Sequence, residues 1–146
     1  MNLARVAIAA LVAWVVYLGV SFVVHTFLLN DLYRQHAGAM RPEVDQHGVL
    51  PVGFVFALVG FFAFAYTYAK GYEGSRGTQE GLRFGVLIGI LICAFRVIWD
   101  HMIWPVSIQL TIAWMVEYIV EFALYGMIVG AIYKPVPRAA RAGVAI

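Results

Sequence analysis

Four long stretches of this sequence contain almost no charged side chains, and they limit the folds open to it. A helix of about 20 residues, rising about 1.5 Å per residue, crosses the roughly 30 Å hydrocarbon core of a bilayer. The apolar residues run continuously rather than alternating, which argues against barrel strands. The sequence therefore predicts an all-α integral membrane four-helix bundle. The stretches are Val6 to Leu29, Val49 to Ala69, Phe84 to Trp99 and Leu110 to Tyr133.

The composition agrees with a membrane protein. Of the 146 residues, 63% are hydrophobic and 12% are charged, and the mean hydropathy is +0.84. A soluble domain of this size is less apolar and more highly charged. The single cysteine, Cys93, excludes an internal disulfide or a CxxC redox pair. A formal net charge of +2 from scattered basic residues argues against nucleic acid as a partner.

The chain is expected to form one transmembrane domain over residues 1–133, followed by an extended C-terminal tail over 134–146. The first span is longer than the apolar part of a signal peptide and precedes no convincing cleavage site, so we expect it to be retained. A short turn from Pro105 to Gln109 joins the last two spans as a hairpin. The expected spans are about 4–29, 49–70, 82–104 and 109–133.

The distribution of Lys and Arg predicts the orientation of the bundle. Positive residues accumulate on the cytoplasmic side of membrane proteins, so both termini are predicted to be cytoplasmic. Trp99, Trp104 and Trp114 then lie near the outer boundary, while Trp14 lies near mid-membrane and must pack against lipid or another protein. The predicted cytoplasmic side holds Arg5, Lys70, Arg76, Arg83, Lys134, Arg138 and Arg141, and the outer side holds Arg34 and Arg41.

Small residues recur at every fourth position near the start of the third span. This row predicts a groove in which another helix backbone can approach closely. A similar pair lies near the end of the fourth span, so packing within the bundle and packing against another subunit both remain open. The helix-packing residues are Gly77, Gly81, Gly85 and Gly89 in the third span, and Gly126 and Gly130 in the fourth.

Arg96 is the only positive charge within the four apolar stretches, and its position predicts a partner. At about 100° per residue it lies about 20° from the Gly89 row, so it is expected to face the bundle. Glu117 lies at a similar depth on the antiparallel neighbouring helix, roughly 10 to 12 Å below the boundary. We therefore predict an ion pair between Arg96 and Glu117, with Asp100, one turn along the same helix, as the alternative partner.

Further polar residues are expected to join this pair. Glu117, Glu121 and Tyr125 are spaced by four on the fourth span, and Tyr17, Ser21 and His25 share that spacing on the first. Glu121 lies near mid-membrane, where desolvation favours the neutral acid. His25 can donate to Glu121 or to Asp100 if the helices pack suitably. The predicted intramembrane polar cluster is His25, Arg96, Asp100, Glu117, Glu121 and Tyr125.

Some residues of the chain are of types that can form other kinds of chemical site. His25 or His101 can serve as an axial ligand of a haem or chlorin, because imidazole is the usual ligand, although hydrogen bonding to a neighbour is the commoner role. The outer loop holds residues able to bind metal but without a recognised spacing, so we predict no metal site. No nucleophile with an adjacent base and no phosphate loop is present, so we predict no enzyme. The loop residues are Asp31, His36, Glu43, Asp45 and His47.

Three short segments carry a resemblance to a family. They are Tyr72-Glu73-Gly74, the run from Glu80 to Gly85, and the run from Val129 to Pro135. In these segments the chain resembles small uncharacterised four-span bacterial integral membrane proteins, best over spans two to four. The resemblance implies the same four-span architecture in the inner membrane of a bacterium and brings no assigned activity with it.

These observations lead to one expected function and one alternative. An aromatic-rich exterior without a catalytic motif favours a non-catalytic accessory subunit that packs against a larger membrane complex, such as a bacterial respiratory or photosynthetic assembly. The expected partners are other membrane protein subunits and bound membrane lipid, with no cofactor. The alternative is a small transporter or proton-conducting protein that uses Arg96, Glu117 and Glu121, because ionisable groups inside a membrane mark ion paths.

Overall fold

The computed structural model describes residues 1–74 and 76–135, so all of the predicted tail beyond Pro135 lies outside the described residues. The described part is helical and contains no strand. Four helical segments are long and apolar enough to cross a membrane: Leu3–Leu28, Val44–Gly71, Gly77–Ile103 and Ile108–Ile132. The predictions of an all-helical fold and of four helices long and apolar enough to cross a membrane are thereby confirmed, while the second and third of these segments begin about five residues earlier than expected.

The elements follow in the order α1, α2, α3, α4, α5 and α6, and π-helical turns interrupt two of the spans. Tight turns or short loops connect the spans. The bounds are α1 Leu3–Val23, a π turn Val24–Leu28, α2 Asn30–Gln35, a 3-10 turn Ala37–Ala39, α3 Glu43–Gly71, α4 Gly77–Ile92, a π turn Cys93–Val97, α5 Ile98–Ile103 and α6 Ile108–Ile132.

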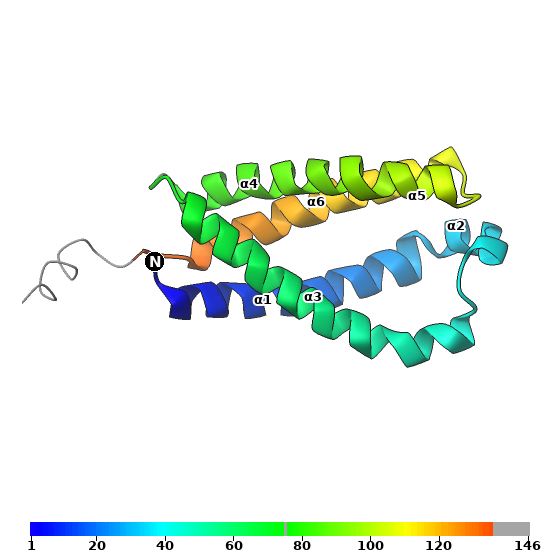
Figure 1. Ribbon diagram of the computed structural model, residues 1–146, viewed down its shortest axis with the longest axis horizontal. Coiled ribbons are helices and arrows are strands. Elements are labelled where there is room, and N and C mark those ends of the chain that lie inside the picture. The colour runs from blue at the N-terminus through cyan, green and yellow to red at the C-terminus, as the bar shows by residue number, and fades with distance from the viewer. Residues whose placement is uncertain (75, 136–146) are drawn as a thin grey trace, which may run out of the picture.

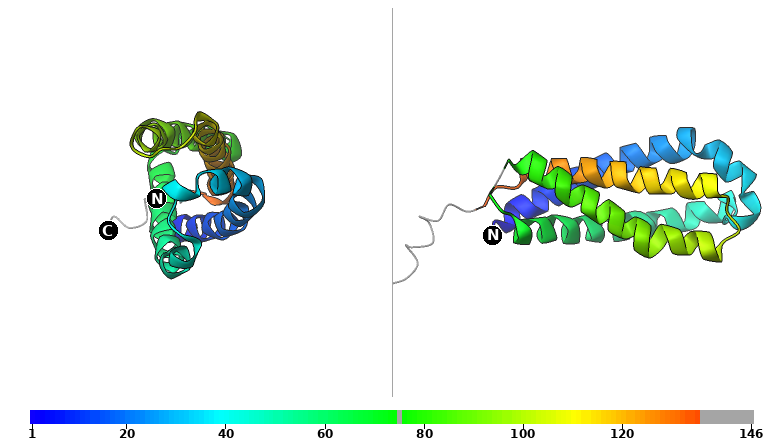
Figure 2. Two further views of the ribbon diagram at one scale, coloured as in Figure 1. Left: turned by 90° about the vertical axis from the view of Figure 1, so that its right-hand side faces the viewer. Right: turned by 90° about the horizontal axis from the view of Figure 1, so that it is seen from above.

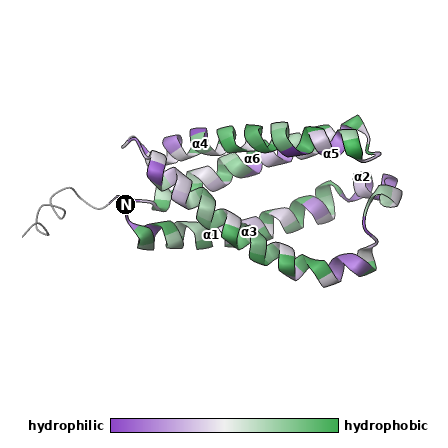
Figure 3. Cartoon of the chain, viewed as in Figure 1, coloured by the Kyte–Doolittle hydropathy of each residue, from purple (hydrophilic) through white to green (hydrophobic). Residues whose placement is uncertain are grey.

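The helices form an elongated bundle with two distinct ends (Figure 1). The N-terminus, the α3–α4 connection and the end of α6 lie together at what we call the terminal end. The short helix α2 and the α5–α6 turn lie at the opposite, loop end (Figures 1 and 2). Hydrophobic residues cover most of the length of the helices, and hydrophilic residues gather near the ends (Figure 3).

Helices α4 and α6 pack along a row of glycines, and at this contact the backbones of the two helices touch. A Cβ atom added at Gly81 would overlap the carbonyl oxygen of Gly126, and one added at Gly85 would overlap that of Phe122. Gly77 and Gly130 meet in the same way. The glycine rows therefore pack against each other within one chain, because only a missing side chain lets the two backbones come this close.

Helix α3 packs less completely than the others. Only 17% of its most apolar window is buried, against 28% in each of the other three spans. Its second half contributes Phe61, Phe64 and Tyr68 to the buried core. Its first half runs away from the other helices towards the loop end (Figure 1), where Val52 and Phe56 are 57% and 71% exposed. The bundle is thus closed at the terminal end and open beside α3 at the loop end.

Trp14, which was expected to pack against lipid or another protein, also joins α1 to α3. Its indole Nε1–H donates to the carbonyl oxygen of Phe54 over 3.0 Å. This bond crosses between the two helices close to the point where they begin to separate. The indole thereby finds its acceptor inside the chain, on the backbone of the neighbouring span.

Candidate functional site

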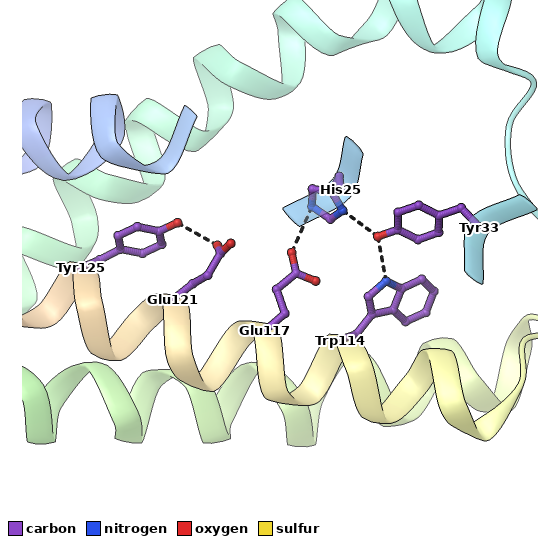
Figure 4. Close-up of polar contacts among 6 residues, drawn as sticks. All are labelled: His25, Tyr33, Trp114, Glu117, Glu121 and Tyr125. Carbon is purple, nitrogen blue, oxygen red and sulfur yellow. Dashed lines mark hydrogen bonds and ion pairs between the residues drawn. The ribbon is translucent and has the colours of Figure 1, made fainter. Parts of the chain in front are cut away.

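A buried polar cluster lies between α1 and α6 in the half of the bundle nearer the loop end (Figure 4). Glu117 and Glu121 lie one helical turn apart on α6 and both extend towards α1. The Glu117 side chain is 8% exposed and the Glu121 residue 6%. Carboxyl groups this deep within an apolar bundle are costly to bury, so their partners decide what the cluster can do.

His25 is the partner of Glu117. Its Nε2 atom lies 3.1 Å from Oε1 of Glu117, and its Nδ1 atom lies 2.6 Å from the hydroxyl oxygen of Tyr33. The Tyr33 oxygen also accepts the indole N–H of Trp114 over 3.1 Å. Four side chains, from the π turn that follows α1, from α2 and from α6, therefore form one continuous chain of contacts (Figure 4).

The donors in this chain can all point towards Glu117. Tyr33 has a single hydroxyl proton, and burial raises its pKa, so the hydroxyl stays protonated at ordinary pH. When that proton is donated to Nδ1 of a neutral His25, Nε2–H is left to donate to the carboxylate. Each donor then has an acceptor, and the series of hydrogen bonds runs from Trp114 through Tyr33 and His25 to Glu117.

Glu121 is held from the opposite side. The hydroxyl group of Tyr125, which is 1% exposed, donates to Oε2 of Glu121 over 2.7 Å. The second oxygen of each carboxyl group, Oε2 of Glu117 and Oε1 of Glu121, is buried and has no hydrogen-bond partner within the described residues. The two carboxyl groups thus keep acceptor capacity that a proton, a small cation or another donor can use.

The predicted ion pair between Arg96 and Glu117 is wrong. Nε of Arg96 lies 2.5 Å from Oδ2 of Asp100, the predicted alternative, and the Arg96 side chain is 68% exposed. The buried face continues from Gly89 through Cys93 to Val97, so Arg96 is turned away from it. Arg96 and Asp100 therefore form a separate pair outside the buried cluster.

The π turn explains the error. Within Cys93–Val97 the amide of Ile98 bonds to the carbonyl of Cys93, five residues earlier, which underwinds the helix. In this underwound segment, residues spaced by four stay on one face, so Val97 rather than Arg96 lies on the buried face. A regular helix, at 100° per residue, would place Arg96 near that face. A second π turn, Val24–Leu28, contains His25. Single π turns inside helices frequently accompany functional sites, and here both occur at polar positions.

Two residues of the cluster, Tyr33 and Trp114, were absent from the sequence-based list. Trp114 lies three residues before Glu117, so helical spacing placed it on the same face. It was interpreted only as a residue of the membrane boundary. Tyr33 follows a break between α1 and α2, and no periodic pattern extends across that break to predict its contact with His25.

Two further histidines near the loop end, His36 and His101, also have partners within the chain. Nδ1 of His36 donates to the carbonyl of Leu32 over 2.7 Å, and Nε2 accepts from the amide of Ser107 over 3.0 Å. Nδ1 of His101 lies 2.9 Å from the hydroxyl of Thr111. A haem or chlorin at His25 would have to displace one of that residue's two contacts. Within the described residues, no group of three or more His, Cys, Asp or Glu is arranged to hold a metal ion.

An aromatic layer separates the polar cluster from the terminal end. The ring of Phe61 lies 5.4 Å from that of Tyr17 and 5.1 Å from that of Tyr125, and Phe64 lies 5.6 Å from Phe122. Phe61 and Phe64 are 6% and 7% exposed. His25, Glu117 and Glu121 thus lie on the loop-end side of these packed rings.

Comparison with known proteins does not extend this description, because no family model, curated protein or solved structure matches the chain. The candidate site therefore rests on its own residues and their geometry.

Proposed function

We propose that this protein is a non-catalytic accessory subunit of the bacterial inner membrane, which packs against another integral membrane protein. Both termini would lie in the cytoplasm, so the loop end would face outwards. A respiratory or photosynthetic complex is the proposed setting. The observation that supports the proposal is the open side of the bundle along the first half of α3.

An apolar groove follows this open side between α1 and α3. It has a volume of about 700 Å³ and is almost free of polar surface. Gly19 lies in the groove with nothing near the place of a Cβ atom, so a neighbouring backbone can approach closely there. The occupant we propose is one apolar transmembrane helix of a different protein. The groove is lined by Trp14, Leu18, Gly19, Phe22, Pro51, Phe54, Val55 and Leu58.

In this function the polar cluster, which we call the polar clamp, would hold the helices in a fixed arrangement. The contacts from His25 and Tyr33 to α6 hold α1 and α2 against the α4–α6 hairpin at the end where α3 is splayed. A partner helix in the groove would then meet a fixed surface, so less conformational entropy is lost on binding.

Site-directed photocrosslinking in the native host tests the proposal. A photoreactive side chain at Val55, inside the groove, should form one discrete adduct with another membrane protein, which mass spectrometry then identifies. The matched control is Val120 on α6, because these two valines are 62% and 61% exposed. Equal adducts at both positions, an adduct with a second copy of the chain or a lipid adduct alone would contradict the proposal.

A proton-handling protein is the second candidate, and the buried carboxyl oxygens without partners favour it. His25 replaces Arg96 in this alternative, so the groups that would carry protons are His25, Glu117 and Glu121. A path across the membrane would also require water to pass the aromatic layer, because Phe side chains cannot relay protons.

Proton flux through the purified protein in liposomes distinguishes the two candidates. A proton-handling protein should conduct, and Glu121→Gln should abolish the flux, while the control Asp31→Asn on α2 should leave it unchanged. Proton flux no greater than in empty liposomes would exclude the proton-handling function, and the accessory function would remain as the proposal.

A further inference from the structure

A second cavity lies at the loop end, between the start of α3 and the α5–α6 turn. Its volume is about 710 Å³, and its lining combines charged and aromatic side chains. It is distinct from the groove between α1 and α3, because the two share no lining residue, although both include residues of α3. The side chains that matter here are Arg41, Asp45, Arg96, Asp100, Trp104 and Trp114.

Arg96 offers free hydrogen-bond donors to this cavity. Its Nε–H is used by Asp100, which fixes the plane of the guanidinium group. A guanidinium carries five N–H donors, and no acceptor for the other four is found within the described residues. The side chain is 68% exposed, so these donors can reach a ligand. A phosphate group suits them, since it accepts two parallel N–H bonds from one guanidinium.

The remaining side chains select against a purely anionic ligand. The two positive side chains, Arg41 and Arg96, are matched by two carboxylates, Asp45 and Asp100, which would repel extra negative charge. A primary ammonium group could pair with Asp45, and the faces of Trp104 or Trp114 also attract a cation. The lining therefore complements a zwitterion that bears both a phosphate and an amine.

The position of the cavity indicates a lipid rather than a soluble molecule. Arg96 lies seven residues before the end of its span at Ile103, or about 10 Å along the helix. Its bond to Asp100 directs the guanidinium towards the loop end, where phosphate groups of a bilayer lie. Phe95 and Trp99 on the same helix are 76% and 55% exposed, which provides apolar surface for acyl chains.

We propose that this cavity binds the headgroup of an amine-bearing zwitterionic phospholipid of the phosphatidylethanolamine type. Arg96 and Arg41 hold the phosphate, and Asp45 holds the ammonium group. The proposal does not depend on the accessory function, because the cavity and the apolar groove have separate walls.

Native mass spectrometry of the delipidated full-length protein tests this site. The protein is mixed with equal amounts of phosphatidylethanolamine, phosphatidylcholine and phosphatidylglycerol that carry the same acyl chains. We expect phosphatidylethanolamine to be retained preferentially. Arg96→Gln should lower its retention roughly tenfold or more, the usual effect of losing a hydrogen bond from a charged donor. Asp45→Asn should remove the preference over phosphatidylglycerol while lipid still binds.

Two controls keep the result interpretable. Arg34→Gln removes an exposed arginine on α2 that does not line the cavity, so it should bind like the original protein. Arg41→Gln is the second cavity variant, and it decides the outcome if Arg96→Gln fails to fold. Unchanged retention in a folded Arg96→Gln or Arg41→Gln variant, or a preference for phosphatidylglycerol, would overturn the proposal. Displacement of the lipid by an equal concentration of free phosphoethanolamine would identify a soluble ligand instead.

Discussion

At the terminal end, α4 and α6 touch backbone to backbone, whereas at the loop end α1 and α6 are joined through long polar side chains. The glycine contacts leave no room for a Cβ atom at Gly81 or Gly85. The contacts of His25 and Tyr33 with α6 leave two carboxyl oxygens without partners. One region is fully packed, and the other retains unused hydrogen-bonding capacity.

The region that stabilises the fold is therefore distinct from the region that keeps polar groups available for binding. Close backbone contact stabilises membrane helices through dispersion and allows few alternative arrangements. Polar contacts with unused acceptors can rearrange when a proton or a partner arrives. Both proposed binding surfaces include residues from the first half of α3: Asp45 lines the charged cavity, and Pro51, Phe54 and Val55 line the apolar groove.

The largest expected effect comes from filling the glycine contact. Gly85→Leu would force the backbone of α6 away at Phe122, and we expect a loss of about 3 kcal/mol or more in the free energy of unfolding. Unfolding in mixed micelles with increasing denaturing detergent measures it. Gly60→Leu on α3 is the control, because nothing lies within 4 Å of its Cβ position. Equal losses in both variants would show that the glycine contact is not what stabilises the bundle.

The glycine rows and the four spans could be predicted from the sequence because both depend on regular spacing and on composition. Gly81 and Gly126 lie on straight α-helical segments, where counting by four identifies the shared face correctly. The lengths of the spans follow from the thickness of a bilayer, which requires no knowledge of tertiary contacts.

The partners of the charged residues could not be predicted in the same way. Arg96 lies within a π turn, and one irregular turn is enough to rotate a side chain out of the expected face. The choice between Glu117 and Asp100 for Arg96 also depended on where His25 lies, which is set by the packing of α1 on α6. That packing is a tertiary property with little periodic signal along the chain.

Breaking the polar clamp should have the next largest effect. His25→Leu leaves the buried carboxyl group of Glu117 without its partner, and we expect a loss of about 2 kcal/mol, reduced because the histidine side chain is 47% exposed. The double variant His25→Leu with Glu117→Leu should recover much of this loss, because no unpaired carboxyl group remains. The same detergent unfolding assay measures His25→Leu, Glu117→Leu and the double variant, and strictly additive losses would rule out the contact.

A smaller effect is expected where α1 and α3 begin to separate. Trp14→Phe keeps an aromatic ring but removes the N–H that bonds to the carbonyl of Phe54, so about 1 kcal/mol should be lost. Because this bond fixes the point of divergence, hydrogen exchange should increase at the backbone of α3 near Phe54 and remain unchanged in the α4–α6 hairpin. Uniform changes in both regions would indicate that the two halves of the bundle do not behave independently.

The smallest effect on stability is expected at the charged pair near the loop end. Arg96→Gln removes an exposed ion pair with Asp100, and such pairs contribute between about 0 and 1 kcal/mol. A double-mutant cycle between Arg96 and Glu117 should likewise give no coupling, in contrast to the cycle between His25 and Glu117. A coupling above about 1 kcal/mol would place Arg96 inside the buried cluster after all. Its absence, together with reduced lipid retention in Arg96→Gln, would show that this intramembrane arginine contributes to binding at the loop end rather than to the packing of the helices.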